Sequence, residues 1–235
     1  MRLGGKVADR LLWPRREVMV QFRNREEAAE QLARQLNRYR GRRPLVLGVP
    51  RGGVPMARIV AERLGGDLDI VLVHKLRAPY QEELAVGAID EQGETTVSPW
   101  AQAAGVDEAY LDRETAQQLA LIRRRRRLYT PDRKALQVAG RDVIVVDDGI
   151  ATGSTLMAAL RSVRRLAPAR LIAAIGVAPT HTLREIEKVA DEAVCGYASD
   201  EFVAVGQFFE DFSGVSDDEV IAALHPAPSA VRNQN

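Results

Sequence analysis

Two adjacent carboxylates stand directly before a loop rich in glycine and hydroxyl residues. The apolar run Val-Ile-Val-Val at 143–146 leads to Asp147 and Asp148, and residues 149–155 read Gly-Ile-Ala-Thr-Gly-Ser-Thr. Glycines let the backbone come close to a ligand, and hydroxyl groups at a helix start suit a terminal phosphate. Two carboxylates can accept hydrogen bonds from vicinal hydroxyls. The pattern predicts a site for a phosphorylated sugar, with a plain β–α turn as the alternative.

Basic residues follow two other predicted strands. Arg51 lies in the run Pro-Arg-Gly-Gly at 50–53, where the glycines admit an anion and the guanidinium can bind it through two N–H groups. Lys75 and Arg77 end the next strand. Because the carboxyl ends of parallel strands meet at one edge of a sheet, we expect these cations at the same crevice. A turn with a solvated side chain is the alternative for Arg51, and His74 is expected to pack rather than catalyse.

Apolar periodicity places these residues on alternating strands and helices. We expect strands at 44–49, 69–74, 142–146, 170–177 and 192–195, and helices starting at 24 and spanning 54–64, 107–128, 154–166, 183–189 and 217–224. This alternation predicts an α/β fold with a doubly wound parallel sheet. Residues 76–100 break the rhythm and predict an inserted hairpin or flap. The expected organisation is an arm at 1–23, one domain at 24–225 and a tail at 226–235.

The overall charge is nearly balanced, with 33 lysines and arginines against 32 aspartates and glutamates in 235 residues. This balance argues against bulk attraction to nucleic acid or to an anionic membrane. A single cysteine excludes a disulfide framework and fits a reducing compartment. Because the sequence has no apolar run of about 18 residues and no secretory leader, it predicts a cytoplasmic protein. We expect a homo-oligomer, namely a dimer.

The stretch from 143 to 155, Val-Ile-Val-Val-Asp-Asp-Gly-Ile-Ala-Thr-Gly-Ser-Thr, closely resembles the phosphoribosyl-pyrophosphate (PRPP) signature of type I phosphoribosyltransferases. The element order from 24 to 225 is similar to that family, which includes uncharacterised bacterial members, and the insertion at 76–100 resembles its flexible hood. The resemblance implies a Mg²⁺-dependent enzyme. Such an enzyme transfers the ribose 5-phosphate of PRPP to a nitrogen acceptor and releases pyrophosphate.

The resemblance also implies a role for each matching residue. Asp147 and Asp148 would hold the ribose hydroxyls, and together with Lys75 and Arg51 they are the expected catalytic residues. The 5′-phosphate would lie on Gly149, Ile150, Ala151, Thr152, Gly153, Ser154 and Thr155. The pyrophosphate would lie on Arg51, Gly52, Gly53, Lys75 and Arg77.

The segment 201–212 is similar to the C-terminal stretch of the purine-salvage members. By that match Phe202 would stack on the base, and Glu210 or Asp211 would lie near Mg²⁺. The ion itself would be held mainly by ligand oxygens and water, because the sequence shows no dedicated carboxylate cage. For the other aromatic residues of this segment, a hydrophobic patch that closes the core is the alternative.

The acceptor and the activity stay open at this point. The 6-oxopurine enzymes of the family carry a third aspartate where this chain has Ala151, which argues against that acceptor class. Glu82 and Glu83 of the flap either handle a proton on the acceptor or are solvated. A non-catalytic PRPP or nucleotide sensor on the same fold is the alternative function. Five arginines at 123–127 fit a solvated helix end, and a subunit or RNA contact is the alternative.

Overall fold

The computed structural model describes residues 21–79, 81–131 and 133–225. Of the expected N-terminal arm it includes residues 21–23, and the expected tail at 226–235 lies outside the described residues. The division of the chain into arm, domain and tail therefore stays a prediction.

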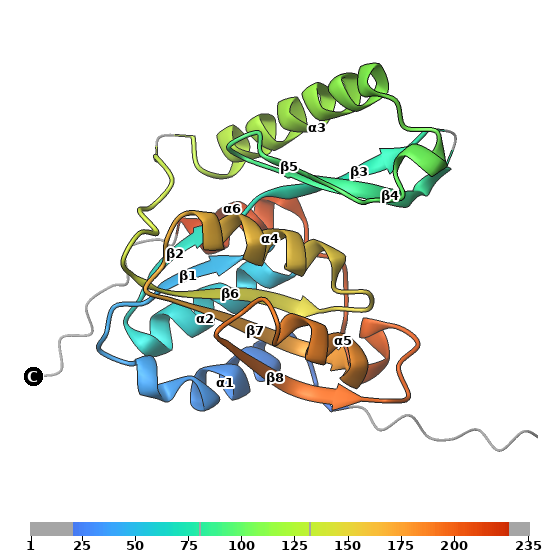
Figure 1. The fold of residues 1–235 in the computed structure, drawn as a ribbon. Helices are drawn as coiled ribbons and strands as arrows, with labels where there is room; N and C mark the ends of the chain where they lie inside the picture. The colour runs from blue at the N-terminus through green and yellow to red at the C-terminus, as the bar shows by residue number, and fades with distance from the viewer. Residues whose placement is uncertain (1–20, 80, 132, 226–235) are drawn as a thin grey trace, which may run out of the picture.

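A parallel sheet of five strands forms the centre of the protein (Figure 1). Its strands are β1 (Leu45–Gly48), β2 (Asp67–Ile70), β6 (Asp142–Gly149), β7 (Arg170–Pro179) and β8 (Glu192–Ser199). They lie in the order β2-β1-β6-β7-β8, and every neighbouring pair is parallel. The central strands are almost continuous apolar runs, because both faces of the sheet are covered.

Helices pack on both faces of this sheet (Figure 1). One face carries α1 (Arg25–Gln35) and α2 (Gly53–Leu64), and the other carries α4 (Ser154–Arg165) and α5 (Thr180–Ile186). Along β1, Val46 packs in the core on the α1 and α2 face, and its neighbour Leu45 packs in the core on the α4 and α5 face. This is expected, because side chains alternate along a strand. The predicted α/β fold with a doubly wound parallel sheet is confirmed.

A second, smaller sheet forms a hood over α4 (Figure 1). Its antiparallel strands are β3 (Val73–Ala78), β4 (Gln81–Asp90) and β5 (Thr95–Val97), followed by η2 (Gln102–Ala104) and α3 (Glu108–Tyr129). The hairpin β4–β5 lies within the insertion expected at 76–100. The long helix α3 packs on the hood, where Leu76, Ile89 and Ile122 are all buried. It also contacts the edge strand β2 of the central sheet, because Arg126 donates to the Ile70 carbonyl at 3.0 Å. The hood is therefore larger than the hairpin that the sequence indicates.

Three further short elements complete the described chain: η1 (Asn37–Tyr39), η3 (Val205–Phe208) and α6 (Asp217–Leu224). Helix α6 packs against α2 of the core and α3 of the hood. It spans the residues expected from the sequence, because Ser216 caps it by accepting a hydrogen bond from the N–H of Glu219.

The strand expected at 69–74 is wrong as a single element. Strand β2 ends at Ile70, and the chain then leaves the central sheet and enters the hood as β3 at Val73. Val71 and Leu72 between them are buried, so the apolar run continues through the crossing. An unbroken apolar run shows that a segment is buried, but it does not show which sheet the segment joins.

Charged side chains are buried where the hood meets the core. The Asp69 carboxylate, 1% exposed, accepts hydrogen bonds from Arg126 Nη1 at 2.8 Å and from Arg133 Nη2 at 3.1 Å. Arg126 also donates through Nε to Glu91 at 2.7 Å, directly after β4. Arg126 thus holds the hood to the sheet. The sequence predicts that the arginines at 123–127 are solvated, and for Arg126 this prediction is wrong.

A second buried carboxylate joins the hood to α4. Asp90, at the end of β4, is 3% exposed and accepts a hydrogen bond from Ser162 Oγ at 2.8 Å. The same carboxylate pairs with Arg165 at the end of α4. The hood is therefore tied to the core by charge pairs as well as by apolar packing.

Candidate functional site

The order in which the chain adds strands to the sheet reverses between the parallel neighbours β1 and β6. From β1 the chain continues to β2 on one side, and from β6 it continues to β7 on the other. Such a reversal leaves a crevice beyond the carboxyl ends of the two strands, where ligands bind in open parallel sheets. The loop after β1 and the loop after β6 both begin at this crevice. The two anion-binding loops expected from the sequence are therefore neighbours.

Asp147 and Asp148 lie at the end of β6, and both are half-buried. The N–H of Asp148 donates a hydrogen bond to Asp147 Oδ1 at 3.0 Å. Burial and the neighbouring Asp148 carboxylate raise the pKa of Asp147 well above its usual range. A carboxyl group with a strongly raised pKa in a crevice is typical of a functional site.

Asp147→Asn is expected to stabilise the ligand-free protein near neutral pH. Because the folded-state pKa is raised, the ionised carboxyl destabilises the fold, and stability falls as the pH rises through that pKa. Asparagine removes the charge and keeps a side-chain oxygen that can accept the hydrogen bond from the N–H of Asp148. We expect the free energy of unfolding to rise by about 1–2 kcal/mol at about pH 7.5, measured by urea unfolding. The gain should shrink towards about pH 4, and a gain that is independent of pH would contradict the assignment.

The loop after β6 and the start of α4, residues 149–155, are the expected phosphate loop and form a candidate anion site. Gly153 at the N-cap adopts a left-handed φ of +69°, which suits glycine. The side chains of Asn24, Asp107 and Ser216 cap α1, α3 and α6, whereas α4 begins without a side-chain cap. The N–H of Ser154 donates to Thr152 Oγ1 at 3.5 Å, and the next N–H groups of the helix are available to an anion.

A cavity of about 210 Å³ lies over this loop. It is lined by Lys75, Asp147 and residues 149–156, which include all seven residues expected to hold the 5′-phosphate. Thr152 Oγ1 lies 3.2 Å from Ser154 Oγ, which places two hydroxyl groups together at the loop. Thr182 of α5 donates to the carbonyl of Ala151 at 2.8 Å and fixes the loop backbone.

Lys75 reaches this cavity from the hood. The sequence predicts Lys75 and Arg77 at the end of a central strand, but both lie on β3, and this expectation is wrong. Arg77 does not line the cavity, and its N–H donates to Glu114 of α3 at 3.3 Å. His74 also faces α3, with Nδ1 2.9 Å from Gln118 Oε1, and burial lowers the pKa of His74. The hood thus supplies one cation directly to the phosphate loop.

Arg51, Gly52 and Gly53 connect β1 to α2, next to the acidic pair. A Cβ atom at Gly52 would overlap the Asp148 carboxylate, so the close approach of the two loops requires glycine. Helix α2, like α4, begins without a side-chain cap. The N–H groups of Gly53 and Val54 at the start of α2 donate to the carbonyls of Val49 and Arg51, at 3.1 Å each. The open start of α4 and the Arg51 side chain therefore meet at one crevice, a combination that suits a ligand with two separate phosphate groups.

Asp217 links this loop to the hood. The exposed Arg51 side chain has its Nη1 3.9 Å from Asp217 Oδ1, and the same oxygen accepts a hydrogen bond from Tyr129 at 2.6 Å. Burial and the hydrogen bond to Asp217 raise the pKa of Tyr129 to about 12. The tyrosine therefore acts as a hydrogen-bond donor at the end of α3.

Arg25 and Phe212 are site residues that the sequence does not reveal. Arg25 Nε donates to Asp148 Oδ2 at 2.7 Å, and the two side chains are 15% and 14% exposed. Arg25 Nη1 donates to the carbonyl of Ser213 at 2.7 Å, and its Cζ lies 3.8 Å from the centre of the Phe212 ring. Arg25 is 123 residues from Asp148 in sequence, and an arginine after a helix cap resembles any solvated helix residue.

The remaining expected site residues are Phe202, Glu210 and Asp211, and none of them lines the cavity over the phosphate loop. Phe202 is half-buried and packs on Phe208, with ring centres 5.1 Å apart. Glu210 and Asp211 are exposed, and Asp211 Oδ1 accepts from the N–H of Ser213 at 3.0 Å. Their roles toward a base and Mg²⁺ stay predictions. The side chains of residues 82 and 83 lie outside the described part of the chain.

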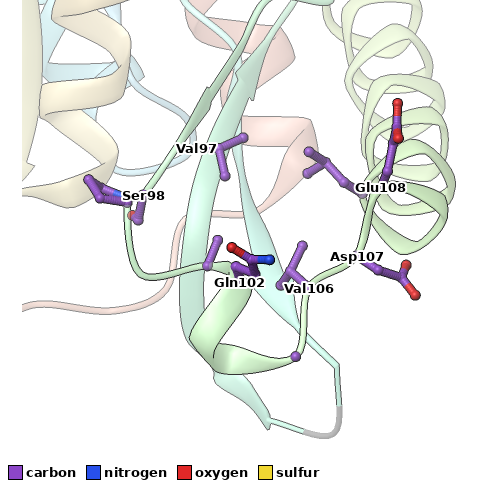
Figure 2. Close-up of a pocket in the computed structure, with 10 residues that line it drawn as sticks. Val97, Ser98, Gln102, Val106, Asp107 and Glu108 are labelled. Carbon is purple, nitrogen blue, oxygen red and sulfur yellow. The ribbon is translucent and has the colours of Figure 1, made fainter.

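The hood also carries an open pocket of about 630 Å³ between β5 and the start of α3 (Figure 2). Val97, Val106 and Leu111 give it apolar walls, while Asp107 at its rim caps α3 by accepting from the N–H of Tyr110. A smaller cavity of about 270 Å³ shares Val97 and reaches Ser154 of α4. The smaller cavity, and not the larger pocket, includes a residue of the phosphate loop, and the residues of the larger pocket are not those of an anion site.

Fold and crevice together define a doubly wound α/β protein in which two carboxylates and an uncapped helix start lie together at the carboxyl ends of parallel strands. Within the described residues, no helix is long and apolar enough to cross a membrane.

Comparison with known proteins identifies the family. The model of the phosphoribosyl transferase domain matches residues 19–210, and the chain belongs to this family. It is 38% identical over 210 residues to Rv0571c of Mycobacterium tuberculosis H37Rv, a protein with the provisional name of phosphoribosyl transferase. The match covers 89% of this chain and 47% of that protein, so the chain spans about half the length of the curated relatives it matches.

A solved structure shows the same fold. The crystal structure of TT1426 from Thermus thermophilus superposes with a TM-score of 0.77 at 42% identity. The match covers 87% of this chain and 97% of that chain. The fold of this chain is thus similar to that of the Thermus thermophilus protein, although more than half of the matched residues differ.

Proposed function

We propose that the protein is a Mg²⁺-dependent phosphoribosyltransferase that moves the ribose 5-phosphate of PRPP to a nitrogen acceptor and releases pyrophosphate. The observation that carries this proposal is the cavity in which Asp147 and the uncapped start of α4 meet Lys75 from the hood, with Asp148 next to Asp147 at the end of β6. In this proposal the phosphate lies on residues 149–155, and the ribose hydroxyls lie on the acidic pair.

The chemistry that this arrangement suits is a displacement at the anomeric carbon. The acceptor nitrogen forms a bond to that carbon as the bond to the pyrophosphate oxygen breaks, and the electron pair leaves with pyrophosphate. Arg51 and Lys75 would stabilise the charge that develops on the leaving group. The hood would exclude water from an electron-deficient sugar that water could otherwise attack. The base or amine that accepts the ribose 5-phosphate would lose a proton.

The donor set of the crevice fits Mg²⁺ held mainly by the substrate. Among the residues the structure describes, no three histidine, cysteine, aspartate or glutamate side chains come together as a metal site. The carboxylates of Asp147 and Asp148 would offer oxygen atoms of the kind that Mg²⁺ prefers, and Glu210 or Asp211 would lie near the ion. Phosphate oxygens and water would supply most of its ligands. When bound, Mg²⁺ would neutralise charge on the pyrophosphate.

A titration with PRPP and Mg²⁺ tests the binding half of the proposal. We expect saturable binding of one PRPP per chain by calorimetry, with weaker binding of ribose 5-phosphate and of pyrophosphate, since each fills one part of the crevice. Absence of PRPP binding would overturn the proposal. A PRPP sensor on the same fold gains no support from the similar proteins, and it would bind PRPP without releasing pyrophosphate for any acceptor.

Lys75→Met is expected to lower PRPP affinity by about 10- to 100-fold, because a hydrogen bond to a charged group contributes about 1.5–3 kcal/mol. Lys75 lines the cavity over the phosphate loop, and methionine keeps its length without its charge. Lys188→Met is the matched control, since Lys188 is exposed and pairs with Glu185 on α5. Equal PRPP affinity of the Lys75 variant and the wild type would remove Lys75 from the site.

The acceptor and the assembly need their own measurements. Ala151 stands in the phosphate loop where 6-oxopurine enzymes carry an aspartate, so we propose an acceptor outside that class. We further propose a homodimer in the cytoplasm, in keeping with the single cysteine. Light scattering of the purified protein tests the dimer, and a mass of one chain in solution would contradict it.

A further inference from the structure

We propose that Arg25 is a positioning residue for the acidic pair: its guanidinium holds Asp148 Oδ2 and so presents Asp148 Oδ1 to the sugar. The inference rests on the proposed function and goes beyond it, because Arg25 belongs to no motif of the crevice loops. It lies on α1, which supplies no other residue to the site described above. The 2.7 Å bond between Arg25 Nε and Asp148 Oδ2 is the contact that carries it.

Arg25 is itself held from both sides. Its helix is capped by Asn24 and anchored by buried residues such as Leu32. On the other side a column of aromatic rings supports it. Phe22 lies 5.6 Å from Phe209, Phe209 stacks on Phe212 at 4.9 Å, and the guanidinium lies on Phe212. An arginine fixed by stacking and hydrogen bonds loses little further freedom when it orients a carboxylate.

The position of Asp148 shows what this contact does. Gly52 of the loop after β1 touches the same side of the carboxylate that Arg25 binds. With Oδ2 held between the guanidinium and this loop, the carboxylate cannot rotate freely about its side chain. The remaining oxygen is the one that can accept a hydrogen bond from a ribose hydroxyl. The positive charge of Arg25 also lies directly beside the negative charge of the Asp148 carboxylate.

The geometry requires arginine rather than a positive charge alone. Arg25 uses Nε for Asp148, Nη1 for the carbonyl of Ser213 and its planar face for Phe212. Lysine offers a single ammonium group on a flexible stem, and it cannot make these three contacts together. We therefore expect Arg25→Lys to retain part of the contribution that Arg25 makes to PRPP affinity, and Arg25→Gln to lose nearly all of that contribution.

A double-mutant cycle with PRPP titration tests the inference. Arg25→Gln is expected to lower PRPP affinity by about 10- to 100-fold, the loss typical of a residue that holds a ligand-binding side chain in place. In an Asp148→Asn background the same change should lower affinity by less than about threefold, because the side chain it orients is already altered. A structural role unconnected with Asp148 would give the same loss in both backgrounds, and that result would overturn the inference.

Arg63→Gln is the matched control. Arg63 of α2 pairs with Glu30 of α1 on the surface, so its loss also removes an ion pair of α1 but leaves the crevice intact. It should bind PRPP like the wild type. Should Arg25→Gln not fold, Arg25→Lys gives the same comparison, with an affinity between wild type and full loss. Wild-type affinity in the Arg25 variants overturns this inference alone, whereas absence of PRPP binding by the wild type overturns the proposed function as well.

Discussion

Replacing Asp147 and Asp148 together by asparagine is expected to weaken PRPP binding by at least about 100-fold. Each carboxylate would accept hydrogen bonds from ribose hydroxyls, and a hydrogen bond to a charged group contributes about 1.5–3 kcal/mol, so two such losses multiply. Asparagine keeps the shape of both side chains and one acceptor oxygen in each. The measurement is a calorimetric titration with PRPP and Mg²⁺ at low salt.

Asp112→Asn serves as the control for this variant, because Asp112 is exposed on α3 and lies outside the crevice. Circular dichroism and thermal unfolding verify that the double variant is folded before its affinity is compared. Unchanged PRPP affinity in a folded Asp147→Asn/Asp148→Asn protein would show that the sugar binds elsewhere. The Asp147→Asn variant alone should bind weakly and yet be more stable than the wild type, a combination expected where function requires an unfavourable charge.

Asp69→Ala is expected to reduce the free energy of unfolding by about 3–5 kcal/mol, the largest effect on stability among these variants. The carboxylate is 1% exposed and accepts hydrogen bonds from Arg126 and Arg133 and from the N–H of Leu136. Alanine would leave these donors in a buried place without their acceptor. For a chain of this size such a loss lowers Tm by roughly 6–20 °C. Urea and thermal unfolding measure it.

Arg124→Ala is the control within the same run of arginines, since Arg124 is exposed on α3. A surface change of this kind should alter stability by less than about 0.5 kcal/mol. The contrast separates the buried charge pairs of Asp69, which join the hood to the sheet, from an arginine of α3 that faces solvent. Equal effects of the two variants would mean that the buried charge pairs do not hold the hood in place.

The part of the site that the sequence predicts is the part that is local in the chain. Residues 147–155 include the end of one strand, a loop and the start of one helix, so all three can be seen in a single stretch of residues. The same holds for α6, whose capping box defines its start. Local patterns of this kind are sufficient because every interaction that they imply lies within a few residues.

Long-range contacts are the part that the sequence does not predict. Arg25 meets Asp148 across 123 residues, and Arg126 meets Asp69 across 57 residues. Charged residues on a helix have the same pattern whether they face solvent or a buried partner. The hood shows the same limit, because the periodicity of α3 predicts a helix but not the surface on which it packs. Lys75 reaches the phosphate loop only because β3 belongs to the hood.

The most direct test of the proposed activity is the release of pyrophosphate. The protein is incubated with PRPP and Mg²⁺ and a panel of nucleobases and amines, and pyrophosphate and the ribosylated product are detected by mass spectrometry. We expect at least one nitrogen acceptor to give pyrophosphate and a product with added ribose 5-phosphate, and the Asp147→Asn/Asp148→Asn variant to give neither. Binding of PRPP without acceptor-dependent pyrophosphate from any member of the panel would contradict the account.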